Sequence, residues 1–221
     1  RMASAGRVKS ITLKTLKSYK TEFDKVIDVV VYNGYAYVTD YSIGTSKGIM
    51  LVVNVRNPAK MREGAAYNVG GNPWGMTLSN GRLYVASSSS SSLTWAGITV
   101  WDLSTPSRPK LDSYYYFTNA TNISVVNQVA VVTAHGTVTF LDLSGVGGIR
   151  TMYTMKKPTV TYQDSIGVPS FLNGKIYVPL GSAGVVALNA QELAARTMIL
   201  GKAKIMDGNG NPVYIDTGGA L

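Results

Sequence analysis

Two aspartates are the residues of this chain that could perform acid-base chemistry. Asp28 and Asp164 could flank a scissile bond as the carboxylate pair of a glycoside hydrolase or of a lactonase-like enzyme. Asp28 also fits a simpler role, as a hydrogen-bonded polar residue within a strand, and this role is favoured. His135 is the only histidine and lies in an expected hairpin, so Ser-His-Asp catalysis is not favoured. We therefore expect a protein without enzymatic activity.

No cofactor or metal site is expected from the residue types. The chain has no cysteine and one histidine, which excludes thiolate and multi-histidine zinc sites. Residues 207–211 read Asp-Gly-Asn-Gly-Asn and resemble the start of a calcium loop, but Pro212 stands where that loop needs glycine. A hairpin turn explains the same residues. No glycine-rich phosphate-binding motif lies between an expected strand and a helix.

The chain carries a formal net charge of +9, from 21 Lys and Arg against 12 Asp and Glu. Such a surplus attracts anionic partners, including acidic glycans and anionic surfaces. A candidate basic surface near the start of the chain consists of Lys9, Lys14, Lys17 and Lys20. Nucleic acid is not a favoured partner, because only Tyr19 and Phe23 accompany these lysines where several stacking aromatics are expected. The alternative is that the lysines protect a strand edge from aggregation.

An internal repeat must position these residues. An asparagine turn follows an apolar run four times, at Asn33, Asn80, Asn127 and Asn173, with steps of 47, 47 and 46 residues. Each unit reads as four short strands, because β-branched segments alternate with turn residues and with Asn-Pro or Thr-Pro breaks. A period near this length with four strands per unit is typical of a β-propeller blade.

The first two units give the clearest strand predictions. In the first unit the expected strands are 26–32, 35–40, 49–55 and 65–69, and in the second they are 74–79, 83–87, 98–103 and 111–117. Residues 138–143 and 185–188 occupy the place of the third strand in the last two units. A short helix is expected around 189–197, where Asn189 could cap and Glu192 follows three residues later.

The ring is expected to close as five blades. Residues 207–215 resemble the first two strands of a further unit, and residues 7–14 and 16–21 resemble its last two strands. A blade shared between the termini would remove exposed sheet edges. The expected fold is therefore all-β, a five-bladed β-propeller with four-stranded blades, forming a single domain over residues 1–221. Because the chain begins at Arg1, a processed product or a fragment of a longer chain stays open.

Two segments resemble LVIVD-type β-propeller repeats. Residues 52–58 read Val-Val-Asn-Val-Arg-Asn-Pro and residues 100–106 read Val-Trp-Asp-Leu-Ser-Thr-Pro. Each is followed by an Asn-Gly-x-x-Tyr-Val type strand pair. The resemblance covers two units well and the other two loosely. It implies a protein that is extracellular or displayed on a cell or particle surface, without an assigned chemistry.

The mouth of the expected channel is the candidate ligand site. Five residues before each turn asparagine stand Asp28, Gly75, Asn122, Val168 and Lys204. The candidate binding residues at this mouth are Asp28, Trp74, Asn122 and Lys204. One carboxylate among five equivalent positions is not a catalytic pair, so this pattern favours binding over catalysis.

The function expected from the sequence is a non-catalytic scaffold for protein–protein association at a cell or particle surface. A carbohydrate-binding propeller that uses the channel mouth is the first alternative, and a glycoside hydrolase or lactonase is the second. The aromatic run 114–117 is expected to expose a partner-binding face on an outer strand, with at least half of it buried, because alternate strand residues face opposite ways. No apolar run is long enough for a membrane-spanning helix.

Overall fold

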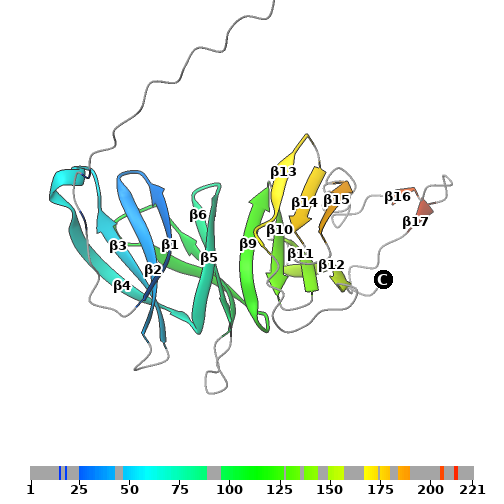
Figure 1. Ribbon diagram of the computed structural model, residues 1–221, viewed down its shortest axis with the longest axis horizontal. Coiled ribbons are helices and arrows are strands. Elements are labelled where there is room, and N and C mark those ends of the chain that lie inside the picture. Colours follow the sequence, from blue (N-terminus) through cyan, green and yellow to red (C-terminus); the bar gives the residue numbers. More distant parts are fainter. Residues whose placement is uncertain are drawn as a thin grey trace, which may run out of the picture.

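The structure is a computed structural model. It describes residues 15, 18, 25–42, 47–88, 96–126, 128–134, 137–143, 149–156, 167–173, 175–179, 184–189, 205–206 and 212–213. Within these residues the chain is all-β, with a single 3-10 turn at Pro58–Lys60. The strands form antiparallel sheets that follow one another along the chain, as the colour order in Figure 1 shows.

Each sheet is built from consecutive strands. The first sheet contains β1 (Lys25–Tyr32), β2 (Tyr35–Ser42), β3 (Lys47–Asn54) and β4 (Arg62–Gly70). The second contains β5 (Asn72–Ser79), β6 (Arg82–Ser88), β7 (Gly97–Asp102) and β8 (Lys110–Tyr116). The third contains β9 (Ala120–Val126), β10 (Val129–Ala134), β11 (Thr137–Asp142) and β12 (Arg150–Lys156). The fourth contains β13 (Ser170–Leu172), β14 (Lys175–Pro179) and β15 (Val185–Asn189), and β16 (Ile205–Met206) pairs with β17 (Pro212–Val213).

The predicted Asn-Gly turns join the first two strands of the sheets. Asn33 and Gly34 have φ angles of 47° and 79°, and Asn80 and Gly81 have 50° and 70°. Positive φ at both central residues is the geometry of the tight hairpin turn that twists with its strands. Asn173 has a φ of 49°. These turns confirm the hairpins on which the repeat was recognised, whereas Asn127 lies outside the described residues.

Apolar cores fill the spaces between successive sheets. Side chains from the first and second sheets share one core, those from the second and third share another, and those from the third and fourth share one more. The largest fully buried side chains include Tyr37, Leu83, Ile98 and Phe140. The middle sheets are therefore buried on both faces, which explains why every residue of β10 is buried and why its sequence is apolar without alternation.

The first and fourth sheets each turn one face away from their neighbours. On β1, Val29 and Val31 are exposed, whereas Val30 between them packs on the first core. On the fourth sheet, Leu172 and Val185 are exposed on the face opposite the shared core. A further buried cluster on the outward face of the first sheet consists of Ala36, Val38, Leu51 and Val53. Both end sheets thus carry apolar side chains on the faces that no other described sheet covers.

The strand predictions for the first two units are confirmed to within three residues at every boundary. The predicted four-stranded unit holds for three sheets, and the fourth has three strands within the described residues. Asn189, the expected helix cap, is the last residue of β15, and residues 190–197 lie outside the described part. A hairpin of β16 and β17 lies near the expected final one, but β16 precedes the predicted range 207–215. Met206 pairs with Pro212, whereas a two-residue turn at 209–210 would pair it with Val213.

Candidate functional site

The first strands of the three complete sheets are β1, β5 and β9, and they lie side by side (Figure 1). Each of them contains a β-bulge at the equivalent position. The extra residue is Ile27 in β1, Trp74 in β5 and Thr121 in β9, so the bulge recurs every 47 residues. A bulge bends its strand and redirects the side chains beside it. Because the three bulged residues differ in type, this feature could not be predicted from the sequence.

Asp28 follows the first bulge, and both of its carboxylate oxygens accept a backbone hydrogen bond. Met76 of β5 donates its N–H to Oδ2 at 2.8 Å, and Val29 donates its own to Oδ1 at 2.8 Å. The carboxylate therefore ties the first sheet to the second. This geometry matches the role of a hydrogen-bonded polar strand residue, which the sequence favoured for Asp28 over catalysis.

Asn122 approaches the same place from the other side. Its Oδ1 atom lies 3.2 Å, and its Cα 3.3 Å, from the position that a Cβ atom would take on Gly75. The absence of a side chain at Gly75 thus allows β9 to pack closely on β5. Asp28 contacts β5 at Met76 and Asn122 contacts it at the adjacent Gly75. The structure therefore brings together two of the four binding residues predicted at the channel mouth, which we call the rim residues.

Trp74 is the third rim residue within the described part of the chain. Its indole is 43% exposed, and its Nε1–H donates to the Ser88 hydroxyl at 2.7 Å. The ring is therefore held in place with one part open to solvent. Lys204 lies outside the described residues, as do Asp164 and His135, so the structure does not test the proposed carboxylate pair.

Polar residues at the ends of the third strands stabilise the turns that follow. Asn54 accepts the N–H of Arg56 at 3.1 Å, and Asp102 accepts the N–H of Ser104 at 2.8 Å. The hydrogen bonds from Ser104, with the nearby positive charge of Arg82, lower the pKa of Asp102. These residues serve the backbone of the turns.

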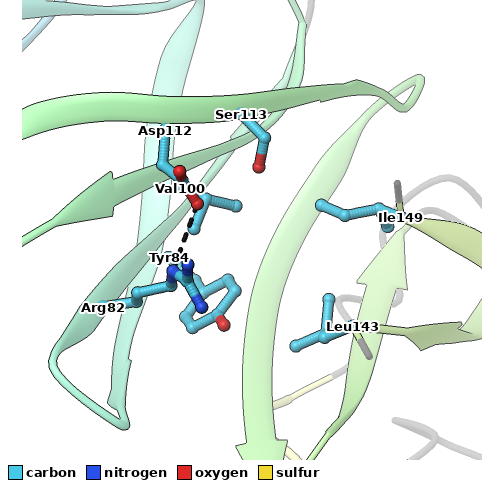
Figure 2. Close-up of a pocket in the computed structure, with 7 residues that line it drawn as sticks. All are labelled: Arg82, Tyr84, Val100, Asp112, Ser113, Leu143 and Ile149. Atoms are coloured by element: carbon cyan, nitrogen blue, oxygen red, sulfur yellow. Dashed lines mark ion pairs between the residues drawn. The ribbon is translucent and has the colours of Figure 1, made fainter. Parts of the chain in front are cut away.

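A hollow between the second and third sheets was not predicted from the sequence. Its volume is about 280 Å³, and Figure 2 shows its walls. The lining residues are Arg82, Tyr84, Val100, Asp112, Ser113, Leu143 and Ile149. The second sheet has another bulge at Asp112 in β8, where Ser113 pairs with Val100, Leu111 pairs with Trp101, and Asp112 is left without a strand partner. Arg82 and Asp112, both lining the hollow, form an ion pair with 3.1 Å between Nε and Oδ2.

The other face of β8 carries the aromatic surface that the sequence predicted. Leu111, Tyr114 and Tyr116 are exposed, and we call these three residues the β8 strip. Tyr115 faces the other way, where its hydroxyl lies 2.7 Å from that of Thr151 in the third sheet. The expected division of the run 114–117 into exposed and packed side chains is confirmed.

Three other expectations concern charge, metals and membranes. The candidate basic surface of Lys9, Lys14, Lys17 and Lys20 lies outside the described residues. In the described part of the chain, no group of three or more His, Cys, Asp or Glu residues could hold a metal ion. Nor does that part contain a helix long and apolar enough to cross a membrane.

Comparisons with known proteins give no family for the chain. No family model matches it, and no curated protein matches it. The resemblance to LVIVD-type repeats therefore stays a prediction.

Solved structures give low similarity scores. A complex of S. cerevisiae Dbp5 with Nup159, Gle1, IP6 and ADP has a TM-score of 0.43 and 12% identity, over 74% of this chain and 42% of that chain. The N-terminal domain of Nup159 has a TM-score of 0.46 and 13% identity, over 78% and 42%. A protein of unknown function from Desulfotomaculum acetoxidans has a TM-score of 0.44 and 7% identity, over 90% and 71%. This chain thus spans less than half the length of the first two.

Proposed function

We propose that the protein is a non-catalytic scaffold that associates with another protein through the β8 strip. The observation that carries this proposal is the exposure of three large apolar side chains on one face of β8. Tyr116 is 63% exposed, and Leu111 and Tyr114 are exposed beside it. Tyrosine is enriched in the cores of protein interfaces, because its ring supplies apolar contact area and its hydroxyl a polar contact.

The strip is presented on an ordered strand. The Tyr114 hydroxyl donates to the carbonyl of Ala96 at 2.6 Å, which fixes one of its aromatic rings. A fixed side chain loses little conformational entropy when a partner binds, so more of the contact energy remains as affinity. Arg108 and Lys110 precede the strip and are exposed, which together with the net charge of the chain favours a partner with an anionic surface.

The proposed scaffold is a closed five-bladed β-propeller of the LVIVD type, located outside the cell or on a cell or particle surface. Apolar side chains on the outward faces of both end sheets support closure, because a fifth blade between them would bury Val31 and Leu172. The hairpin of β16 and β17 supports a blade shared between the termini. Removal of residues 1–21 should then lower the free energy of unfolding in urea sharply. An unchanged urea midpoint would contradict closure by the N-terminal segment.

A paired substitution tests the role of the strip. Leu111→Ser combined with Tyr116→Ser should abolish a stoichiometric protein cross-link that the wild-type protein forms in its native source. Val185→Ser is a matched control, because Val185 is as exposed as Tyr116 but lies on the fourth sheet. Salt should weaken the association, since an anionic partner is expected. Equal cross-linking of the paired variant and the wild type would contradict the proposal.

The described residues do not favour the alternatives at the rim. Both oxygens of Asp28 already accept backbone hydrogen bonds. The N–H of Trp74 is likewise engaged by Ser88. Neither a hydrolase nor a carbohydrate site at the rim gains support from these contacts.

A further inference from the structure

The hollow between the second and third sheets has two hydroxyl groups without partners. Tyr84 is only 6% exposed, and Ser113 is half-buried beside it. Figure 2 shows both oxygens directed into the hollow. Within the described part of the chain, neither hydroxyl has a hydrogen-bond partner. Both hydroxyls are therefore available to a molecule that enters the hollow.

The charges at the hollow cancel. Arg82 and Asp112 pair with each other, and their side chains are 50% and 40% exposed. An anionic or cationic ligand would have to compete with this pair, whereas an uncharged ligand can use the remaining donors of the guanidinium and the remaining carboxylate oxygen. Burial raises the pKa of Tyr84, so its hydroxyl stays protonated at neutral pH and can both donate and accept.

The opposite wall of the hollow is apolar. Leu143, which follows β11, and Ile149, which precedes β12, face Tyr84 and Ser113 across the hollow (Figure 2). Val100 of β7 also lines the hollow and is buried. A ligand that fits must therefore have hydroxyl groups on one side and C–H groups on the other. Rings that carry several hydroxyls combine both in one rigid shape.

The volume of the hollow limits the size of the ligand. A cavity of about 150 Å³ holds one benzene ring, and the hollow measures about 280 Å³. It therefore has room for one six-membered ring with its substituents but not for a longer oligomer buried throughout.

We infer that this hollow binds one uncharged, polyhydroxylated six-membered ring, either a free monosaccharide or cyclitol or the terminal sugar of a glycan. Tyr84, Ser113, Arg82 and Asp112 hydrogen-bond to its hydroxyls, and Leu143 and Ile149 contact its C–H face. The site lies on the face of β8 opposite the β8 strip, so it does not depend on the proposed protein association.

Nuclear magnetic resonance titration of the full-length protein tests this inference. The probes are D-glucose, D-galactose, D-mannose and myo-inositol, the methyl glycosides of the three sugars, and the charged sugars glucuronate and glucosamine. At least one neutral probe should shift the amide signals of Tyr84, Ser113 and Ile149 at millimolar concentration. Tighter binding of the free sugar than of its methyl glycoside indicates a small-molecule ligand. Equal or tighter binding of the methyl glycoside indicates a glycan terminus.

Two conservative variants link any binding to the hollow. Tyr84→Phe keeps the ring and removes one hydroxyl, and it should weaken binding about tenfold, the effect of one hydrogen bond to a ligand. Ser113→Ala provides the same test at a more exposed position, in case Tyr84→Phe disturbs folding. Tyr116→Phe removes a hydroxyl from the other face of β8 and should leave the affinity unchanged. The inference is overturned if no neutral probe shifts these signals, if a charged probe binds more tightly, or if the two variants in the hollow bind like the wild type.

Discussion

The first strands and the last strands of the sheets use their polar side chains differently. At the first strands, each carboxylate oxygen of Asp28 accepts one backbone N–H, and the one from Met76 ties the first sheet to the second. At the last strand of the second sheet, the carboxylate of Asp112 pairs with Arg82 at the edge of a hollow, next to hydroxyls without partners. The polar residue of the first strand thus stabilises the fold, whereas the last strand of the second sheet, together with Tyr84, has hydroxyl groups available to a ligand.

The largest expected difference concerns these two aspartates. Asp28→Ala leaves the part-buried N–H of Met76 in the second sheet and the exposed N–H of Val29 in the same strand without their acceptor. It should lower the free energy of unfolding by about 2–3 kcal/mol, mostly through the loss at Met76. Asp112→Ala removes a half-exposed ion pair and should cost less than about 1 kcal/mol. Urea unfolding of both variants measures the two losses. Similar losses would remove the distinction between the inner and outer strands.

Two buried tyrosines sharpen the comparison. The Tyr37 hydroxyl donates to the carbonyl of Pro106 at 2.8 Å, whereas the Tyr84 hydroxyl has no partner among the described residues. Tyr37→Phe should therefore lower the free energy of unfolding by about 1 kcal/mol. Tyr84→Phe should change it by less than about 0.5 kcal/mol. Thermal or urea unfolding in ligand-free buffer distinguishes them, and a larger loss for Tyr84→Phe would mean that its hydroxyl is structural.

Alkaline pH should reveal a further difference, which develops only above pH 10.0. Burial, followed by the neighbouring tyrosines 32, 35 and 67, raises the pKa of Tyr37 from 10.0 to about 12. The unfolded chain therefore loses this proton first as the pH rises above 10.0, so the folded protein loses stability between pH 10.0 and about 12. The urea midpoint should fall more gradually in Tyr37→Phe than in the wild type. Identical pH profiles would show that Tyr37 does not control this transition.

The sequence predicted the strands well because each is short, apolar and bounded by turn residues. Asn33 and Asn80 show this directly, since the positive φ angles that their turns require are those that asparagine and glycine tolerate. The packing of Asp28 against Met76 was not predictable, because it depends on a bulge whose residue type changes from repeat to repeat.

The hollow was also not predictable from the sequence. Its lining residues are spread along the chain between Arg82 and Ile149. No sequence pattern predicts that β6, β8 and the segment before β12 lie next to one another. Tyr84 belongs to an Asn-Gly-x-x-Tyr-Val pair, a context that predicts only a strand. The one available signal was the pair Arg82 and Tyr84, two positions apart on one strand and therefore on the same face. Such a spacing is not specific for a ligand site.

The order of the sheets along the chain also bears on how the protein folds. In the described part of the chain, every sheet is made of consecutive strands, so its backbone pairing joins neighbouring strands of the sequence. Folding of an all-β protein is slow chiefly when distant segments must meet, and within the described sheets the paired strands follow one another along the chain. Each sheet can form by itself and then dock on its neighbour, as in other chains whose units contact only adjacent units. The fourth sheet, with one core face, should be the first to lose protection in hydrogen exchange, ahead of the doubly packed second and third.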